Sequence, residues 1–446
     1  MYKAIIIGAG PAGLASAYYL ARDNISTLIL EKDCQVGGLS KTIVYKDARF
    51  DIGGHRFFTD NKEISSFWSN ILGEHFLKRR RLSRIYYNNK FFDYPLNFTN
   101  TFRNLGIAES ILILLSYFHS RCVRNGSADN FEGYIVNNFG RRLFNIFFKS
   151  YTEKVWGVPC SDISADWARQ RIKGLSMLSA ITKSLAPGKN GSIRTLVKEF
   201  NYPVFGPGMM YEKIAESIIG MNGQISKGMQ AVEFLHNNKK ITRVVANDAS
   251  GKAIEYPVEQ LISSMPIDEL IRGFEPAVPK SIMESAGKLR YRNFITVNLI
   301  CAQASIFPDN WIYIHSPGVK LCRIQNYKNW SPAMFYGRDG ATLGLEYFCS
   351  EDGYLWNESD EILARMAEEE LQTIGFPVQV RDFFVYRAAK AYPVYDVDYK
   401  VHLNIIKDYL NNFSNLQLIG RAGRFRYDNM DVAMDSGIQA ARRITK

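Results

Sequence analysis

The N-terminus contains the feature that most constrains this chain, a glycine-rich turn between an apolar strand and an apolar helix. The β-branched run Ala4–Ile7 continues through Gly8, Gly10 and Gly13 into the helical pattern of PAGLASAYYLAR. In a βαβ unit, the first two glycines of G-x-G-x-x-G allow a tight turn and close approach to a pyrophosphate, and the third lets helix and strand pack. Glu31 ends the second strand, where a carboxylate can bind a ribose hydroxyl. Together these features favour dinucleotide binding over a purely structural glycine turn.

The C-terminal residues return to the same pattern. Leu416–Ile419 predicts a strand, Gly420–Gly423 a turn, and Asp431–Thr445 a helix with Asp431 as its N-cap. A helix N-terminus offers free N–H donors and the positive end of a dipole, which suit the electron-rich pyrimidine edge of a flavin. We therefore expect a discontinuous dinucleotide-binding domain that the N-terminus opens and the C-terminus closes.

Between these ends the pattern changes twice. From about Phe67 to Leu185, apolar residues recur at three- and four-residue spacing, which predicts helices and few strands. The segment APGKNGS at 186–192 breaks both periodicities and predicts a linker or a mobile lid. Strands are expected at 243–245 and 260–264. Alternating runs such as FITVNLI, WIYIHS and LGLEYF, between residues 293 and 386, predict an antiparallel sheet.

The charge of the chain favours anionic partners. Lys and Arg number 55 against 44 Asp and Glu in 446 residues, a formal charge of +11. The densest basic run, Lys78–Arg81 with Arg84 following, is interpreted as a solvated surface. No interleaved basic and aromatic motif of a known nucleic-acid-binding fold is present, so nucleic acid is not expected as a partner. The 13% aromatic content fits either a ring-lined pocket or aromatic core packing.

The cysteines and the apolar runs indicate in which cellular environment the protein is expected. The six cysteines are scattered without C-x-x-C or metal-like spacing, so we expect reduced thiols, no disulfide and no metal site. No apolar run approaches the roughly 20 residues that span a bilayer, and Ile111–Leu115 is interpreted as part of a core helix. The apolar N-terminus is too short for a signal peptide. We expect a soluble, cytoplasmic protein with no stable membrane insertion.

Several segments resemble the flavoprotein UDP-galactopyranose mutases, within the wider group of protoporphyrinogen oxidase and the amine oxidases. The glycine motif, Glu31 and Gly37–Gly38 are common to that whole group. The narrower match lies in GGH at 53–55 with the FFTD that follows it, in IYYNNKFFDYPLNFTNTF at 85–102, and in YTEKVWG at 151–157. The resemblance covers most of the chain.

The resemblance implies an α/β fold with FAD as cofactor. It predicts a GR2-type, Rossmann-like FAD-binding domain with an inserted helical domain and an antiparallel β-sheet domain. We place the FAD domain at 1–66, 193–275 and 400–446, the helical domain with its lid loop at 67–192, and the substrate domain at 276–399. The residues expected to bind FAD are Gly8, Gly10, Ala12, Gly13, Glu31, Lys32, Gly38, Leu39, Gly54, His55, Gly420, Arg421, Met430, Asp431 and Val432.

The family's substrate-binding residues carry over by position. Tyr151 and Trp156 correspond to residues that flank a uracil. Arg171 and Arg323 correspond to two arginines that bind a diphosphate, and they are completed by two tyrosines, Tyr392 and Tyr427. The resemblance places His55 beside the flavin ring and assigns catalytic roles to His55, Arg171 and Arg323.

Such a cluster suits a nucleotide-diphosphate sugar. Guanidinium groups bind phosphate oxygens bidentately, and tyrosine hydroxyls add neutral donors. In the family, N5 of the reduced flavin attacks the anomeric carbon and displaces the diphosphate, and the sugar recloses with another ring size. The resemblance thus implies a net non-redox pyranose–furanose mutase acting on a UDP- or dTDP-sugar, in surface polysaccharide biosynthesis. Its FAD would be active as FADH⁻, reduced by a donor such as NAD(P)H.

Each residue also has a structural interpretation. Tyr151 and Trp156 fit an aromatic core, His55 a hydrogen-bonded structural histidine, and the two arginines a charged surface. The chain also departs from the family: Phe58 stands where bacterial mutases commonly have a second histidine. Substrate choice depends on variable loops, so the sugar and the base stay open.

Two other function classes compete with the mutase. The first is an FAD-dependent oxidoreductase of the amine oxidase or protoporphyrinogen oxidase type, whose site has no use for a diphosphate clamp. The second is a flavoprotein scaffold or nucleic-acid-binding module that exploits the positive charge. A homodimer is compatible with each of them.

Overall fold

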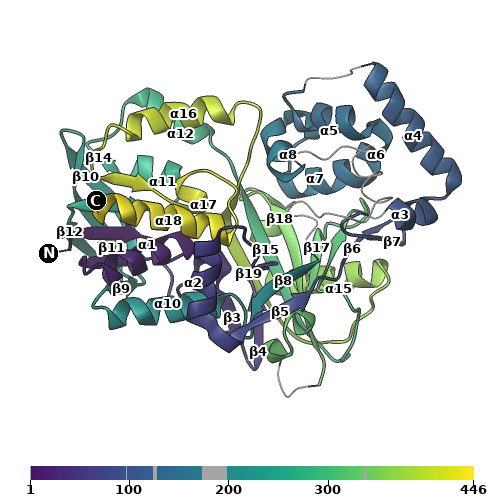
Figure 1. Cartoon of the computed structure of the whole chain (residues 1–446), viewed down its shortest axis with the longest axis horizontal. Coiled ribbons are helices and arrows are strands. Elements are labelled where there is room, and N and C mark those ends of the chain that lie inside the picture. The colour runs from purple at the N-terminus through teal and green to yellow at the C-terminus, as the bar shows by residue number, and fades with distance from the viewer. Residues whose placement is uncertain (1, 97, 124–127, 173–197, 336–338, 446) are drawn as a thin grey trace.

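The computed structural model describes residues 2–96, 98–123, 128–172, 198–335 and 339–445; for Phe98, Arg171 and Ile172 it describes only the backbone. Both termini lie in one half of the molecule, built on a parallel sheet (Figure 1). The other half holds a second, larger sheet with a group of helices beside it.

A five-stranded parallel sheet forms the core of the half that holds the termini. Its strands are, in spatial order, β20 (Leu416–Leu418), β13 (Gln260–Ser263), β1 (Ala4–Ile7), β2 (Thr27–Glu31) and β9 (Gln224–Lys227). β1 and β2 are buried on both faces, as expected for parallel strands covered on both sides. The strands predicted at 4–7, 27–30, 260–264 and 416–419 are confirmed.

Four helices cover one face of this sheet and share a single apolar core with it. They are α1 (Pro11–Arg22), α2 (Lys62–Leu72), α10 (Gly208–Gly220) and α18 (Met430–Thr445). The prediction of Asp431 as the N-cap of the last helix is wrong. The Asn429 carbonyl accepts a hydrogen bond from the Ala433 N–H (2.9 Å), so Asn429 occupies the N-cap position and Asp431 lies in the first turn.

The opposite face of the parallel sheet packs against a four-stranded sheet and three helices. The strands are β12 (Ala253–Pro257), β11 (Lys240–Asn247), β10 (Gln230–Asn237) and β14 (Phe274–Glu275). The helices are α11 (Ile267–Arg272), α12 (Lys280–Lys288) and α16 (Tyr399–Leu410). The strand predicted at 243–245 is confirmed as part of β11.

A seven-stranded sheet forms the second half. Its order is β19 (Val380–Pro393), β15 (Tyr291–Cys301), β18 (Ala341–Cys349), β17 (Arg323–Asn326), β16 (Trp311–Ile314), β6 (Ser83–Tyr87) and β7 (Lys90–Asp93). All neighbours pair antiparallel except β16 and β6. α15 (Asp360–Thr373) packs on this sheet. The antiparallel sheet predicted between residues 293 and 386 is confirmed.

Strands also occur where the sequence pattern predicts helices. Besides β6 and β7, β5 (Phe76–Arg80) pairs with β8 (Glu199–Pro203). The interpretation of the basic run as a solvated surface is wrong for two of its arginines. Arg81 is buried and lies over the rings of Tyr94 and Trp311, and Arg84 forms a bidentate ion pair with the buried Asp309.

Helices do form most of the described part of the segment from residue 98 to 172. They are α3 (Phe98–Leu105), α4 (Ile107–Cys122), α5 (Phe131–Phe139), α6 (Arg141–Phe144), α7 (Ser150–Trp156) and α8 (Ala165–Ile172), with a π-helical turn at Asn145–Lys149. The interpretation of Ile111–Leu115 as core is wrong for Ile111, Leu112 and Leu115, which are exposed; Ile113 is buried. The segment 186–192 lies outside the described residues, and the domain boundaries stay a prediction.

Shorter elements complete the described part of the chain. The hairpin of β3 (Thr42–Tyr45) and β4 (Ala48–Asp51) leads into the segment that carries His55. α13 (Tyr327–Trp330), α14 (Tyr354–Asn357) and α17 (Gly420–Gly423) are single turns. All six cysteines are free thiols. None of the described helices combines the length and apolar character needed to cross a bilayer.

Candidate active site

One elongated cavity, of about 370 Å³, connects the two halves of the molecule. It begins where β1 and β2 end, at the carboxyl edge of the parallel sheet, which is where open α/β sheets bind ligands. Gly8, Gly10, Ala12, Glu31, Lys32, Gly38 and Leu39 line this end. Gly54, His55, Tyr313, Arg323, Tyr392, Gly420, Arg421, Tyr427, Met430 and Asp431 line the rest.

The three glycines of the N-terminal motif have different local environments. A Cβ on Gly13 would lie 1.9 Å from the Gly8 carbonyl oxygen, and one on Gly8, whose φ is +94°, would lie 2.3 Å from Ser264 Oγ. Gly10 has an ordinary φ of −76°, and its nearest neighbour would be 4.0 Å away. No protein atom therefore requires glycine at position 10, and the space in front of it opens into the cavity. This arrangement fits a pyrophosphate held against the backbone.

Glu31 sits at the same end with its carboxylate buried. It accepts hydrogen bonds from the backbone N–H groups of Ala9 (2.5 Å) and Asp33 (2.9 Å), which fix its position at the end of β2. Burial raises the pKa of Glu31, although these two bonds oppose the rise. Glu31 lines the cavity, where its carboxylate could accept a hydrogen bond from a ribose hydroxyl.

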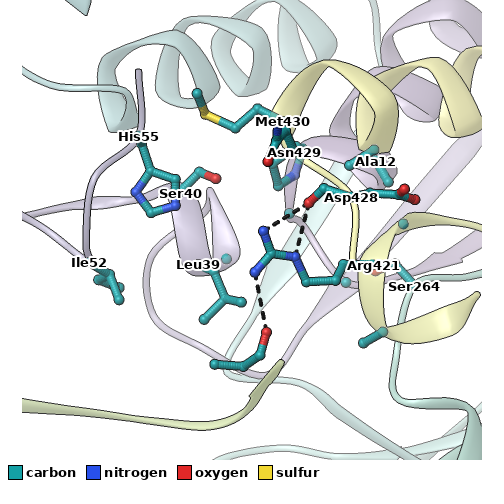
Figure 2. Close-up of a pocket in the computed structure, with 18 of the residues that line it drawn as sticks. Ala12, Leu39, Ser40, Ile52, His55, Ser264, Arg421, Asp428, Asn429 and Met430 are labelled. Atoms are coloured by element: carbon teal, nitrogen blue, oxygen red, sulfur yellow. Dashed lines mark hydrogen bonds between the residues drawn. The ribbon is translucent and has the colours of Figure 1, made fainter. Parts of the chain in front are cut away.

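His55 and Arg421 face each other in the middle of the cavity (Figure 2). Nδ1 of His55 is buried and has no hydrogen-bond partner. Burial and the positive charges of Arg421 and Arg323 lower the pKa of His55 to about 3, so its imidazole is neutral at physiological pH. An orphaned imidazole nitrogen beside an open cavity fits a ligand that supplies the missing partner.

Within the described part of the chain, the Arg421 guanidinium donates its hydrogen bonds to backbone carbonyls and to no carboxylate. Its guanidinium donates to the Asp428 carbonyl oxygen (3.0 and 2.8 Å) and to that of Ala391 (3.3 Å). Its Cζ lies 5.2 Å from the ring centroid of Tyr392 and 4.7 Å from that of Tyr427. The two rings stack on each other at 5.1 Å. This group forms a cationic, hydroxyl-bearing wall next to His55.

Arg323 adds a second cation on the seven-stranded sheet. It donates to the carboxylate of Glu346, with Nε–Oε2 at 2.7 Å and Nη2–Oε2 at 2.5 Å. Gln325 donates to the other carboxylate oxygen at 2.7 Å. Burial is the largest single effect and opposes the charge on Arg323, but the Glu346 carboxylate and the surrounding tyrosines together outweigh burial and raise the pKa of Arg323. The guanidinium therefore stays charged while it lines the cavity.

Sequence reasoning missed Glu346 and Gln325. Glu346 is fully buried and stands directly opposite Arg323 in the register of β17 and β18. The available signal was a lone carboxylate in the otherwise apolar run LGLEYF, and Gln325 lies two residues after Arg323 on the same face. Tyr313, which also lines the cavity, was missed as well.

The YTEKVWG motif lies behind the cavity wall instead of on it. Trp156 is buried in the core and touches Tyr392 and Tyr427 edge-on, at 6.3 and 6.2 Å. Tyr151 stacks on His315 at 4.5 Å and meets Tyr313 edge-on at 5.7 Å. Neither residue is among those that line the cavity. In the described structure they support the tyrosines that do.

Lys154 explains why this motif holds its place. Its ammonium group shares three N–H donors among four backbone carbonyl oxygens, those of Ile314, Ser316, Val319 and Leu321, which lie 2.9–3.2 Å from Nζ. These carbonyls belong to the connection between β16 and β17, so Lys154 ties α7 to the start of the strand that carries Arg323. Burial lowers the pKa of Lys154.

Besides Tyr151 and Trp156, three further predicted residues do not line the cavity or cannot be placed there. Gly13 packs against Gly8, as the third glycine of the motif should, and Val432 is not among the lining residues. Arg171 lies in the last turn of α8, and its side chain lies outside the described part of the structure.

Comparisons with known proteins agree with this geometry. Residues 6–71 match a family model described as an NAD(P)-binding Rossmann-like domain. A crystal structure of reduced UDP-galactopyranose mutase superposes with a TM-score of 0.85 at 21% identity, covering 100% of this chain and 94% of that one. The resemblance to the UDP-galactopyranose mutases is confirmed. The α/β fold with a Rossmann-like domain is confirmed with it.

Two further relatives show how far the likeness extends. The UDP-galactopyranose mutase of Mycoplasma genitalium is 26% identical over 171 residues, 36% of this chain and 42% of that protein. The chain thus matches about two fifths of the length of its curated relatives. A structure from Exiguobacterium sp. 255-15, assigned as a protoporphyrinogen oxidase, superposes with a TM-score of 0.76 at 16% identity, covering 99% of this chain and 98% of that one. The fold is therefore shared beyond the mutases.

Proposed function

We propose that this chain is an FAD-dependent pyranose–furanose mutase acting on a nucleotide-diphosphate sugar. Three features of the cavity lining support FAD as the resident cofactor: the open space at Gly10, the Glu31 carboxylate at the end of β2, and the buried Nδ1 of His55, which has no hydrogen-bond partner among the described residues. The ribose and pyrophosphate of FAD would be held by Gly8, Gly10, Glu31 and Lys32. The flavin ring would be held by His55, Arg421 and the first turn of α18. Bound in its reduced form, FAD supplies a nucleophilic nitrogen for the anomeric carbon of the sugar.

One observation carries the choice of substrate: two cations and two tyrosine rings converge around His55 on the lining of the cavity. Arg323 and Arg421 offer planar donors to phosphate oxygens, and Tyr392 and Tyr427 lie against Arg421. Burial raises the pKa of Tyr392, so its phenol stays protonated and can donate to an anion. A diphosphate fits this chemistry.

The same groups would act during the reaction. When the bond from the sugar to the diphosphate breaks, negative charge grows on the departing oxygen. Arg323 is held by Glu346 before the substrate arrives, so its donors need little reorganisation. Neutral His55 adds no positive charge of its own, and it can hydrogen-bond without taking up a proton. The chain's residues thus bind, orient and stabilise a leaving diphosphate.

An FAD-dependent oxidoreductase is the second candidate, favoured by the structural likeness to proteins named as amine oxidases. A cyclohexylamine oxidase from Brevibacterium oxydans superposes with a TM-score of 0.65 at 14% identity. Such a likeness concerns the fold alone. A site for an amine has no use for two guanidinium groups, because a cationic substrate would be repelled by them.

Calorimetric titration of UDP into the FAD-loaded protein tests whether Arg323 and Arg421 bind the diphosphate. We expect Arg323→Lys and Arg421→Lys each to weaken binding at least tenfold, because a lysine cannot bind phosphate bidentately. Arg84→Lys is the matched control, since Arg84 makes a similar bidentate ion pair away from the cavity. Equal affinity in all three variants, or no binding of any nucleoside diphosphate by the wild type, would contradict the proposal.

A further inference from the structure

One lysine inside the seven-stranded sheet has a backbone conformation that its residue type disfavours. Lys390 of β19 has a φ of +51°, whereas the other non-glycine residues with positive φ in the described part of the chain lie in turns. The strand is irregular at the same place. Between Ala388 and Tyr392, β19 advances four residues while its partner β15 advances two, so β19 bulges. Bulges of this kind occur next to active sites, where they redirect side chains.

The side chain of Lys390 connects the two halves of the molecule. Its ammonium group donates to Asp268 Oδ2 (2.7 Å) and lies 2.8 Å from Glu269 Oε1. Both carboxylates belong to α11, which packs on the parallel sheet, and Glu269 lines the cavity. Asp268 is buried, and its second cation, Arg272, is farther away at 3.6 Å. The carboxylate of Asp268 therefore depends mainly on Lys390 for a counter-charge.

Lys390 keeps its own charge in this position. Burial is the largest single effect and opposes the charge, but the hydrogen bonds and negative charges of Asp268 and Glu269 together outweigh it and raise the pKa of Lys390. The backbone is held as well, because the Lys390 N–H donates to Asn293 Oδ1 (3.0 Å) on the neighbouring strand. A disfavoured φ persists only where surrounding contacts of this kind hold it.

The two residues that follow Lys390 belong to the cavity wall. The Ala391 carbonyl oxygen accepts a hydrogen bond from the Arg421 guanidinium (3.3 Å), and the Tyr392 ring centroid lies 5.2 Å from Arg421 Cζ. Ala391 and Tyr392 both line the cavity. A change of φ at Lys390 would rotate the chain that follows it. The conformation of Lys390 thus sets the direction of two neighbours of Arg421.

We propose that Lys390 is a positioning residue, whose ion pairs with α11 hold the bulge of β19 in the conformation that places Arg421 and Tyr392 around the substrate diphosphate. The diphosphate rests on the proposed function, whereas the placement of Arg421 does not. Because the ion pairs join both halves, they also fix Tyr392, on the seven-stranded sheet, relative to Arg421, which follows the parallel sheet. Without them the bulge can relax, and Arg421 loses its acceptor at Ala391.

UDP titration into the FAD-loaded protein tests the proposal. Lys390→Met should weaken binding by about tenfold, the effect of losing one hydrogen bond to a charged group. Lys390→Arg should bind within about threefold of the wild type, because a guanidinium can pair with the same carboxylates. Lys46→Met is the matched control and should bind like the wild type. Lys46 also has a positive φ (+52°) and pairs with a carboxylate, Asp382 of β19, but it is not among the described residues that line the cavity. Unchanged affinity in Lys390→Met would overturn the proposal.

A second variant separates positioning from a loss of folding. Lys390→Met leaves the Asp268 carboxylate buried without its main partner, which destabilises the fold. Asp268→Asn/Lys390→Met removes both charges, so it should be more stable to urea than Lys390→Met and should still bind UDP about tenfold more weakly than the wild type. Recovery of affinity together with stability would show a folding defect and would sink the proposal.

Non-additivity tests whether Lys390 acts through Arg421. In an Arg421→Lys background, Lys390→Met should weaken UDP binding by no more than about threefold, because residues that act through one another are not additive. The same tenfold loss in both backgrounds would show that Lys390 acts elsewhere.

The flavin spectrum distinguishes a failure of this proposal from a failure of the proposed function. Arg421 lines the part of the cavity assigned to the flavin ring, so Lys390→Met and Arg421→Lys should shift the visible absorbance maximum of bound FAD in the same direction, with or without UDP. A wild type that binds no nucleoside diphosphate would contradict the proposed function and leave this comparison to decide on Lys390. An unshifted spectrum in Lys390→Met would refute the role of Lys390.

Discussion

Arg323 and Glu346 face each other across two antiparallel strands, and the guanidinium donates twice to one carboxylate oxygen, from Nε at 2.7 Å and from Nη2 at 2.5 Å. Glu346 has no exposed surface, and its carboxylate oxygens accept hydrogen bonds from Arg323 and Gln325. The pair therefore holds a cation at the cavity wall that would otherwise be free to rotate.

Removing one member of this pair should harm the fold more than removing both. Arg323→Met leaves the Glu346 carboxylate buried with one donor, and we expect a loss of about 3–5 kcal/mol in the free energy of unfolding. Adding Glu346→Gln should restore much of that loss without restoring UDP binding. Urea unfolding and UDP titration measure the two effects. Additive losses in the double variant would contradict the coupling.

Alanine substitutions at two glycines of the motif should have different effects, one on stability and one on FAD binding. Gly13→Ala places a methyl group 1.9 Å from the Gly8 carbonyl oxygen, so the protein should lose about 1–3 kcal/mol of stability. Gly10→Ala has room, with its nearest neighbour 4.0 Å away, and should leave the apoprotein as stable as the wild type. It should nevertheless purify without FAD, because its methyl group fills the open space at Gly10. Visible absorbance measures the FAD content of each variant, and thermal unfolding of the apoproteins measures their stability. Full FAD content in Gly10→Ala would contradict the proposal that the pyrophosphate lies against Gly10.

Substitution of an aromatic residue on the cavity wall should mainly weaken UDP binding. Substitution of one behind the wall should mainly lower thermal stability. Tyr392→Phe should weaken UDP binding by about ten- to a hundredfold, because it removes a hydroxyl that hydrogen-bonds a charged group. Trp156→Phe keeps an aromatic ring in the core, so it should lower thermal stability and leave UDP affinity within about threefold. The reverse ranking in calorimetric titration would show that Trp156, not Tyr392, contacts the ligand.

The buried Asp51 should make stability fall as pH rises. Burial raises the pKa of Asp51 to about 7, although Tyr202 and Thr42 donate hydrogen bonds that oppose the rise. The unfolded aspartate releases its proton near pH 4, so between about pH 4 and 7 the folded state binds the extra proton. Stability from this group is thus present at low pH and is lost as pH approaches 7.

Comparison with Asp51→Asn isolates that effect. Between pH 5 and 7, the wild type should lose stability relative to Asp51→Asn by up to about 1.4 kcal/mol per pH unit. Asp352→Asn, at an exposed aspartate, is the control and should run parallel to the wild type. Urea unfolding at several pH values gives the profiles. Parallel curves for Asp51→Asn and the wild type would contradict the assignment.

Local sequence patterns were sufficient for four of the five strands of the parallel sheet and for its glycine turn, whereas the edge strand β9 was not predicted. The run Ala4–Ile7, the spaced glycines and Glu31 form one supersecondary unit, in which each part restricts the others. The β6–β7 hairpin was missed although its signal was present: Asn88 and Asn89, both with positive φ, separate two apolar runs as a tight hairpin turn requires. Basic residues around these short strands obscured the alternation.

Long-range features could not be predicted from one sequence. That Glu346 meets Arg323 depends on the register of two strands, which local pattern does not fix. The apolar face of α4 was expected in the core because periodicity shows that a face will be covered, but not by what. Likewise, YTEKVWG predicted aromatic residues at the site, while the fold places them one layer behind Tyr313, Tyr392 and Tyr427.

Turnover by the reduced protein tests the central claim most directly. The FAD-loaded protein, reduced with dithionite, is incubated without oxygen with a panel of UDP- and dTDP-sugars, and the products are separated by chromatography. We predict a furanose isomer of one sugar that forms only with reduced protein, while the flavin stays reduced. No isomer from any sugar, together with reduction of the oxidised flavin by an amine or another reducing substrate, would contradict the account and favour an oxidoreductase.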